Sequence, residues 1–162
     1  MNIHDVLAEV TAAPVVKRAI TNRAALNEAS EYGSAFSRGM RIDLNGLVIL
    51  LISGTASIDD AGRTVHVGDL RAQLRRTFDN ITKLLESEGA TWHDIVRTTC
   101  YLRDIERDYK AFNEERTAFY KEQGLDPLPA STGIQAILCR PDLLVEIEAI
   151  AMFRQTSPGE QE

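Results

Sequence analysis

The sequence predicts an α+β fold in which two helices cover one face of a single mixed β-sheet. Four runs have the alternation or apolar character of strands, and a fifth is apolar on both faces. Two further segments carry apolar residues at helical spacing, and the order along the chain is ββαβαββ. We expect residues 1–30 to form a partly ordered extension, 31–154 one domain and 155–162 a flexible tail.

The first two strands are predicted to form a hairpin. The run GMRIDL over residues 39–44 alternates apolar and polar side chains, as a half-buried strand does. Asn45 and Gly46 follow, and this pair is typical of a two-residue hairpin turn. The return strand, LVILLIS over residues 47–53, is apolar on both faces.

The two helices are predicted from spacing and from their ends. The first begins near Asp69, and Gly89 follows its end. The second covers roughly residues 105–123, and Gly124 stops it. The strand between them is VRTTCYL, residues 96–102.

The last two strands are STGIQAIL, residues 131–138, and LVEIEAIAMF, residues 144–153. Glu146 and Glu148 interrupt the second run and point to the same face, with Cα atoms roughly 6.5–7 Å apart. Carboxylates are rarely buried without a partner or a task. One interpretation is proton transfer by a carboxyl of raised pKa; the other is that both make inter-subunit ion pairs.

The apolar character of residues 47–52 indicates an oligomer. Two helices can cover only one face of a sheet, whereas this strand is apolar on both. Another subunit is the simplest cover for the second face. We therefore expect a homo-oligomer with its sheets facing inward.

Composition narrows the possible partners. Hydrophobic residues make up 44% of the chain, charged residues 26%, and the net charge is −6. This acidic balance disfavours nucleic-acid binding, and Arg71, Arg75 and Arg76 are expected to lie on a solvated helix face. No apolar run is long enough to span a membrane.

Cysteine and histidine usage adds little chemistry. With two cysteines, no secretory signal and no disulfide framework, we expect a cytoplasmic protein. The three histidines share no metal-ligand spacing, so no metal site is expected.

Five segments carry a family resemblance. ISGTASID, RTTCYLRD, FNEERTAFY, PLPASTGI and VEIEAIA occur in the order and spacing of the YjgF/RidA family, which the chain resembles over about residues 32–154. The resemblance implies a chorismate-mutase-like ββαβαββ subunit and a homotrimer with three clefts between subunits. Members hydrolyse reactive imines and enamines, such as 2-aminoacrylate and its imine tautomer, to keto acids and ammonia without a cofactor.

The resemblance also implies site residues. Glu146 corresponds to the glutamate that helps water attack the imine carbon, and Glu148 is expected to make interface contacts. Gly54, with its neighbours Ser53 and Thr55, and Tyr32 would line the cleft.

The chain departs from the family at its carboxylate anchor. Ser131 stands where these members have an arginine, followed by Thr132 and Gly133 in the same substrate-binding segment. A serine hydroxyl cannot replace a bidentate guanidinium. Arg140 is a candidate substitute, but we expect it not to reach the same cleft within one subunit.

The absence of the family arginine leaves several functions of the protein open. A hydrolase acting on an imine other than the standard one is one reading, and a non-catalytic ligand-binding or regulatory trimer is another. The ribonuclease activity assigned to some members is disfavoured by the acidic charge. SGTASI and STGI also resemble the Rid-like part of chorismatases, which bears on pocket shape only.

Overall fold

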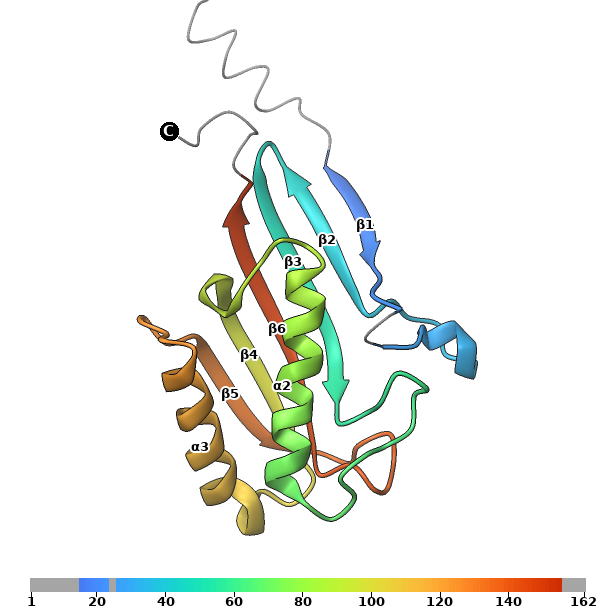
Figure 1. Cartoon of the computed structure of the whole chain (residues 1–162), viewed down its shortest axis with the longest axis vertical. Coiled ribbons are helices and arrows are strands. Elements are labelled where there is room, and N and C mark those ends of the chain that lie inside the picture. The colour runs from blue at the N-terminus through green and yellow to red at the C-terminus, as the bar shows by residue number, and fades with distance from the viewer. Residues whose placement is uncertain (1–14, 24–25, 156–162) are drawn as a thin grey trace, which may run out of the picture.

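The computed structural model describes residues 15–23 and 26–155. Its two helices, α2 (Leu70–Glu86) and α3 (Ile105–Glu122), lie over one face of a six-stranded sheet (Figure 1). The strands run in the order β1-β2-β3-β6-β4-β5, and only the β4–β5 pair is parallel within the described part of the chain. The prediction of an α+β fold with a mixed sheet and two helices is confirmed. The strand bounds are β1 (Val16–Ile20), β2 (Gly39–Leu44), β3 (Leu47–Ala56), β4 (Ile95–Leu102), β5 (Ala130–Gln135) and β6 (Val145–Arg154).

Strand β1 is absent from the order of elements that we predicted from the sequence. It lies inside the segment that we expected to be partly ordered, and it pairs antiparallel with β2. Four of its five residues are exposed and only Ile20 is buried, so its sequence carries little strand pattern. The first part of the expected extension, residues 1–14, and most of the expected tail, residues 156–162, lie outside the described residues.

Both helices begin at an aspartate. The Asp69 side chain accepts a hydrogen bond from the backbone N–H of Ala72, and Asp104 accepts one from Arg107, each at 3.0 Å. These caps satisfy amide groups that the first helical turn leaves without a partner. Helix α2 then buries Leu74, Phe78 and other apolar side chains against β3 and β6. None of the helices in the described ranges is long and apolar enough to cross a lipid bilayer.

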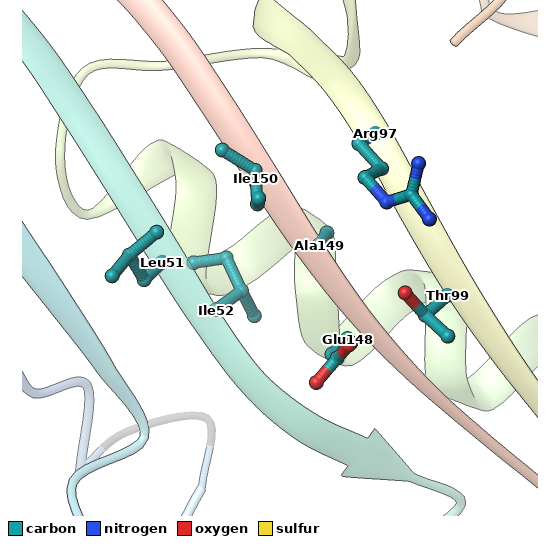
Figure 2. Close-up of a pocket in the computed structure, with 7 residues that line it drawn as sticks. All are labelled: Leu51, Ile52, Arg97, Thr99, Glu148, Ala149 and Ile150. Carbon is teal, nitrogen blue, oxygen red and sulfur yellow. The ribbon is translucent and has the colours of Figure 1, made fainter. Parts of the chain in front are cut away.

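The sheet face that the helices leave uncovered is called the open face here. Leu51 of β3 and Met152 of β6 are 40% and 42% exposed on it. Figure 2 shows the middle of this face, where Leu51, Thr99 and Glu148 come from three neighbouring strands. A large apolar area in contact with water is uncommon on a monomer, so the open face has the character of an interface.

A buried ion pair ties the N-terminal edge of the sheet to the end of α2. The carboxylate of Glu88 accepts hydrogen bonds from Arg18 on β1 and lies 3.4 Å from Arg41 on β2. The side chains of Arg41 and Glu88 are only 7% and 3% exposed. Asp43 also pairs with Arg41, at 2.8 Å.

Candidate functional site

Glu146 lies in a cavity of about 130 Å³ at the end of the sheet. Gly54 of β3 lines the same cavity, as do Arg38, which precedes β2, and Cys139 and Arg140 from the loop before β6. A cavity of this size holds a few water molecules or a small fragment of a ligand. The structure therefore brings the predicted glutamate, glycine and loop arginine together in one chain.

Strand β6 determines which way Glu146 points. Its neighbours Val145 and Ile147 are fully buried in the core beneath the helices. Because side chains alternate along a strand, Glu146 points away from the helices. Its partners on the adjacent strands are Ala56 of β3 and Tyr101 of β4.

An irregularity in β3 makes room for this carboxylate. The pairing between β3 and β6 shifts register between Ile52 and Thr55, which places Ser53 and Gly54 in a bulge. A Cβ atom built on Gly54 would overlap Glu146 Oε1 and lie 3.1 Å from Glu146 Cδ. Glycine is therefore the residue that lets Glu146 adopt its position.

Ser53 and Thr55, the predicted neighbours of Gly54, hold the bulge in place. Ser53 Oγ donates to the carbonyl of Ser37 at 2.7 Å, and Thr55 Oγ1 donates to the carbonyl of Ser53 at 2.8 Å. Their hydroxyl groups are engaged with backbone. Tyr32 is the last residue of a short 3-10 helix, Ala29–Tyr32, which precedes Arg38 in the chain.

The electrostatic setting of Glu146 favours its protonated form. Burial, followed by the charge of nearby Glu148, raises the pKa of the Glu146 carboxyl above its usual value. Among the residues that the structure describes, none forms an ion pair or hydrogen bond with this carboxyl group. Burial and the same two carboxylates raise the pKa of Tyr101. A half-buried carboxyl without a partner, beside a cavity, has the features of a proton-transfer group.

The position of Arg140 contradicts one expectation from the sequence. We expected it not to reach the cleft of Glu146 within one subunit, yet both line the same cavity. The loop before β6 folds back toward the 59–64 turn, where Arg140 Nη1 donates to the carbonyl of Gly62 at 2.6 Å. Thr64 Oγ1 donates to Asp142 at 3.0 Å and fixes the same two loops together. Spacing along an extended strand could not predict this fold-back.

Arg38 is a second cation in the cavity wall, and the sequence analysis missed it. Its side chain is buried and donates through Nε and Nη2 to the carbonyl of Asn27, at 2.8 and 2.6 Å. Its guanidinium carbon lies 5.6 Å from the centre of the Phe36 ring. An isolated arginine just before a strand gives no signal in the sequence, because only the fold turns it inward.

Ser131 lies outside the Glu146 cavity. Its hydroxyl accepts from Thr98 on β4 at 3.0 Å and from Arg116 on α3 at 3.0 Å, so it faces the helices. Glu146 faces the opposite side of the sheet, and β4 separates β5 from β6. One chain therefore does not bring these two predicted residues together.

The other two residues of that predicted segment are also placed away from Glu146. Thr132 accepts from Arg97 Nη2 at 3.0 Å on the open face. Gly133 faces Tyr109 of α3, where an added Cβ would meet only an ordinary contact of 3.8 Å.

The basic cluster on α2 is neutralised by α3. Arg71 pairs with Glu114 and Glu115, and Arg75 pairs with Glu115 and Glu122. This arrangement ties the two helices together and leaves no cationic surface there for a phosphate backbone. Within the described ranges, no three His, Cys, Asp or Glu side chains gather as a metal site.

Comparison with known proteins shows which family the chain belongs to. Residues 26–153 match the family described as Endoribonuclease L-PSP. A RutC family protein of Haemophilus influenzae is 35% identical over 111 residues, which cover 68% of this chain and 82% of that protein. The chain belongs to the YjgF/RidA family. The crystal structure of the Escherichia coli YjgF gene product has a TM-score of 0.69 and 28% identity, covering 85% of this chain and 99% of that one.

One relative in the YjgF/RidA family carries an activity in its name. The 3-aminoacrylate deaminase RutC of Acinetobacter baylyi is 33% identical, over 64% of this chain and 78% of that protein.

Proposed function

We propose that this chain is a cofactor-independent hydrolase of the deaminase type, which acts on a small imine or enamine bearing a carboxylate. The observation that carries the proposal is the half-buried, unpaired carboxyl of Glu146 in a cavity with two arginines. The name of the Acinetobacter baylyi relative supports the reaction class.

Glu146 supplies the proton transfers. Its carboxylate takes a proton from a water molecule as the water oxygen bonds to the imine carbon. Glu146 returns that proton to the nitrogen, which gives a neutral carbinolamine. It then transfers the hydroxyl proton of the carbinolamine to the same nitrogen as the C–N bond breaks, so that ammonia leaves and the carbonyl forms. The net reaction joins one imine and one water to give one carbonyl compound and one ammonia. A raised pKa brings the carboxyl nearer to neutral pH, where a group of this kind both accepts and donates a proton efficiently.

In this proposal, Arg140 takes the role of the arginine that family members have at the position of Ser131. Its guanidinium is held by the carbonyl of Gly62 at the wall of the Glu146 cavity, so it is oriented before the substrate arrives. A planar guanidinium binds a carboxylate through two hydrogen bonds, which fixes the imine carbon relative to Glu146. Because the geometry of this anchor differs from that of an arginine at position 131, the preferred substrate is expected to differ from the 2-aminoacrylate imine.

We propose that the protein assembles as a homotrimer with its sheets facing inward. Its support is the exposed apolar open face, with Leu51, Ile150 and Met152 on adjacent strands. A neighbouring subunit over this face would also narrow the Glu146 cavity, which in one chain has only about 130 Å³.

The test is a hydrolysis assay with 2-imino acids that an L-amino-acid oxidase releases in the cuvette. Ammonia release should accelerate with the purified protein, and Glu146→Gln should lower kcat by about 100-fold or more. Arg140→Gln should mainly raise KM, while Lys110→Gln, at an exposed position on α3 that does not line the cavity, serves as the control. Full activity in Glu146→Gln, or no acceleration by the unmodified protein with any imino acid of the panel, would refute the proposal.

A further inference from the structure

Two arginines line the Glu146 cavity, and they reach it from different parts of the chain. Arg38 precedes β2, and Arg140 lies in the loop before β6. Glu146 is the one acidic side chain among the described residues of the lining. Two guanidinium groups and one carboxyl group give the lining one net positive charge when Glu146 is ionised, and two when it holds its proton. A ligand with two carboxylates matches this excess of positive charge better than a ligand with one.

One contact supports both guanidinium groups. Arg38 donates through Nε and Nη2 to the carbonyl of Asn27, and Nη2 also donates to Asn27 Oδ1 at 2.9 Å. Arg140 Nη1 donates to the carbonyl of Gly62 at 2.6 Å. The side chain of Asn27 lies directly on Gly62, because a Cβ atom built at position 62 would be only 2.4 Å from Asn27 Nδ2. Asn27 and Gly62 thus connect the two arginines across the wall of the cavity.

These hydrogen bonds orient the two arginines without cancelling their charges. Each of the acceptor atoms is a neutral carbonyl or amide oxygen. Arg38 is only 4% exposed, and with so little water around it a charge attracts an anion more strongly than it would at the surface. Both side chains are held before a ligand arrives, so little side-chain entropy remains to be lost on binding.

The size of the cavity limits what can connect two carboxylates. A volume of about 130 Å³ admits only a small group, so the carbon chain between them must be short. We propose that the substrate is a short imine with two carboxylates, in which Arg140 binds the carboxylate next to the imine carbon and Arg38 binds the other. Hydrolysis joins one such imine and one water to give one 2-keto dicarboxylate and one ammonia. This inference rests on the proposed function, because it names the substrate class of the same site.

Succinate and succinamate are suitable probes, because neither is hydrolysed by this chemistry and they differ only in one group. Succinamate has a neutral amide where succinate has its second carboxylate, and the two molecules have nearly the same shape. In titration calorimetry, succinate should bind saturably at one site per chain. Its affinity should be at least tenfold higher than that of succinamate, because only succinate engages both guanidinium groups.

Arginine variants assign each carboxylate to its partner. Arg38→Gln should weaken succinate binding at least tenfold and leave succinamate binding nearly unchanged, whereas Arg140→Gln should weaken the binding of both compounds. Arg38→Lys, which keeps the charge without the planar fork, should bind succinate with intermediate affinity. Lys110→Gln, which removes an exposed cation outside the cavity, is the matched control and should bind both compounds normally. Thermal melts check that each variant is folded.

The same preference should appear in hydrolysis. The imine of aspartate, released by an aspartate oxidase, carries two carboxylates, and the imine of alanine carries one. The value of kcat/KM should be at least tenfold higher for the imine of aspartate. Arg38→Gln should bring the ratio of the two values close to one, because it removes the partner of the second carboxylate.

Two results would overturn the inference. One is equal affinity of the unmodified protein for succinate and succinamate, or no saturable succinate binding at millimolar concentration. The other is an undiminished preference for succinate in folded Arg38→Gln or, if that variant does not fold, in Arg38→Lys. Glu146→Gln separates this inference from the proposed function, because it should abolish hydrolysis and still bind succinate more tightly than succinamate. A protein that shows this binding preference but hydrolyses no imine would refute the proposed hydrolase and leave the dicarboxylate site in place.

Discussion

Gly54 and Glu146 lie against each other on neighbouring strands, and the space that a Cβ atom would need at position 54 is occupied by Glu146 Oε1. The bulge of β3 and the carboxylate of β6 therefore form one unit. A side chain added at position 54 must displace the Glu146 carboxyl, which makes their contact a sensitive point of the candidate site.

Gly54→Ala should push the Glu146 carboxyl out of its position. We expect hydrolysis to fall at least tenfold while the free energy of unfolding changes little, because the added methyl displaces only the end of a flexible side chain. Chemical denaturation and the imino-acid assay measure the two effects. Gly133→Ala is the control for stability, since its Cβ meets only Tyr109 at 3.8 Å. Unchanged hydrolysis by Gly54→Ala would show that the site tolerates the methyl group.

Glu146→Gln should raise the melting temperature at neutral pH. The folded protein holds the Glu146 proton more tightly than the unfolded chain does, because burial raises the pKa of this carboxyl. Stability is therefore lost as pH rises from the unfolded pKa through the folded pKa. Melts from pH 4 to pH 8 should show no gain from glutamine at the acidic end and a growing gain above it. A melting temperature of Glu146→Gln that matches that of the unmodified protein across this pH range would contradict the prediction.

The open face should be the assembly surface. Light scattering of the unmodified protein should give about 54 kDa, three times the 18.0 kDa of one chain. Leu51→Lys should shift the mass toward 18.0 kDa, because it places a charge in an apolar contact. Val67→Lys, at another exposed apolar position outside the sheet, should leave the mass unchanged. A monomeric unmodified protein at micromolar concentration would rule out the trimer.

Glu88→Gln should destabilise the N-terminal edge of the sheet. Buried Arg41 would lose one of its two carboxylate partners and keep Asp43, so we expect a loss of about 1–3 kcal/mol. Arg63→Gln, which breaks an exposed pair with Asp59, should cost clearly less, because water screens exposed ion pairs. Urea titrations of both variants provide the comparison. A smaller effect at Glu88 than at Arg63 would mean that water replaces the lost partner.

Sequence periodicity predicted the fold because the relevant signals are local. The Asn45–Gly46 turn, the Asp69 cap of α2 and the alternation of β6 each depend on a few adjacent residues. Strand β1 escaped notice because it is an edge strand with one buried side chain, so alternation hardly registers.

The candidate site was predictable only in part. Glu146 stood out because a carboxylate interrupts an apolar strand, and Gly54 followed from the family resemblance. The positions of Arg38 and Arg140 depend on loops that fold back on the sheet, and no short pattern encodes such a path.

The loop before β6 carries a practical consequence. Cys139, Arg140 and Glu146 come from one continuous stretch of the chain, and the contacts of Gly62 and Thr64 that brace it come from a single turn. The side of the Glu146 cavity that carries Arg140 is thus built and braced by two short segments, while Gly54 and Arg38 complete the wall. Exchanging residues 59–64 and 136–146 together between relatives should transfer substrate preference as a module, whereas exchanging either one alone would separate the arginine from its brace.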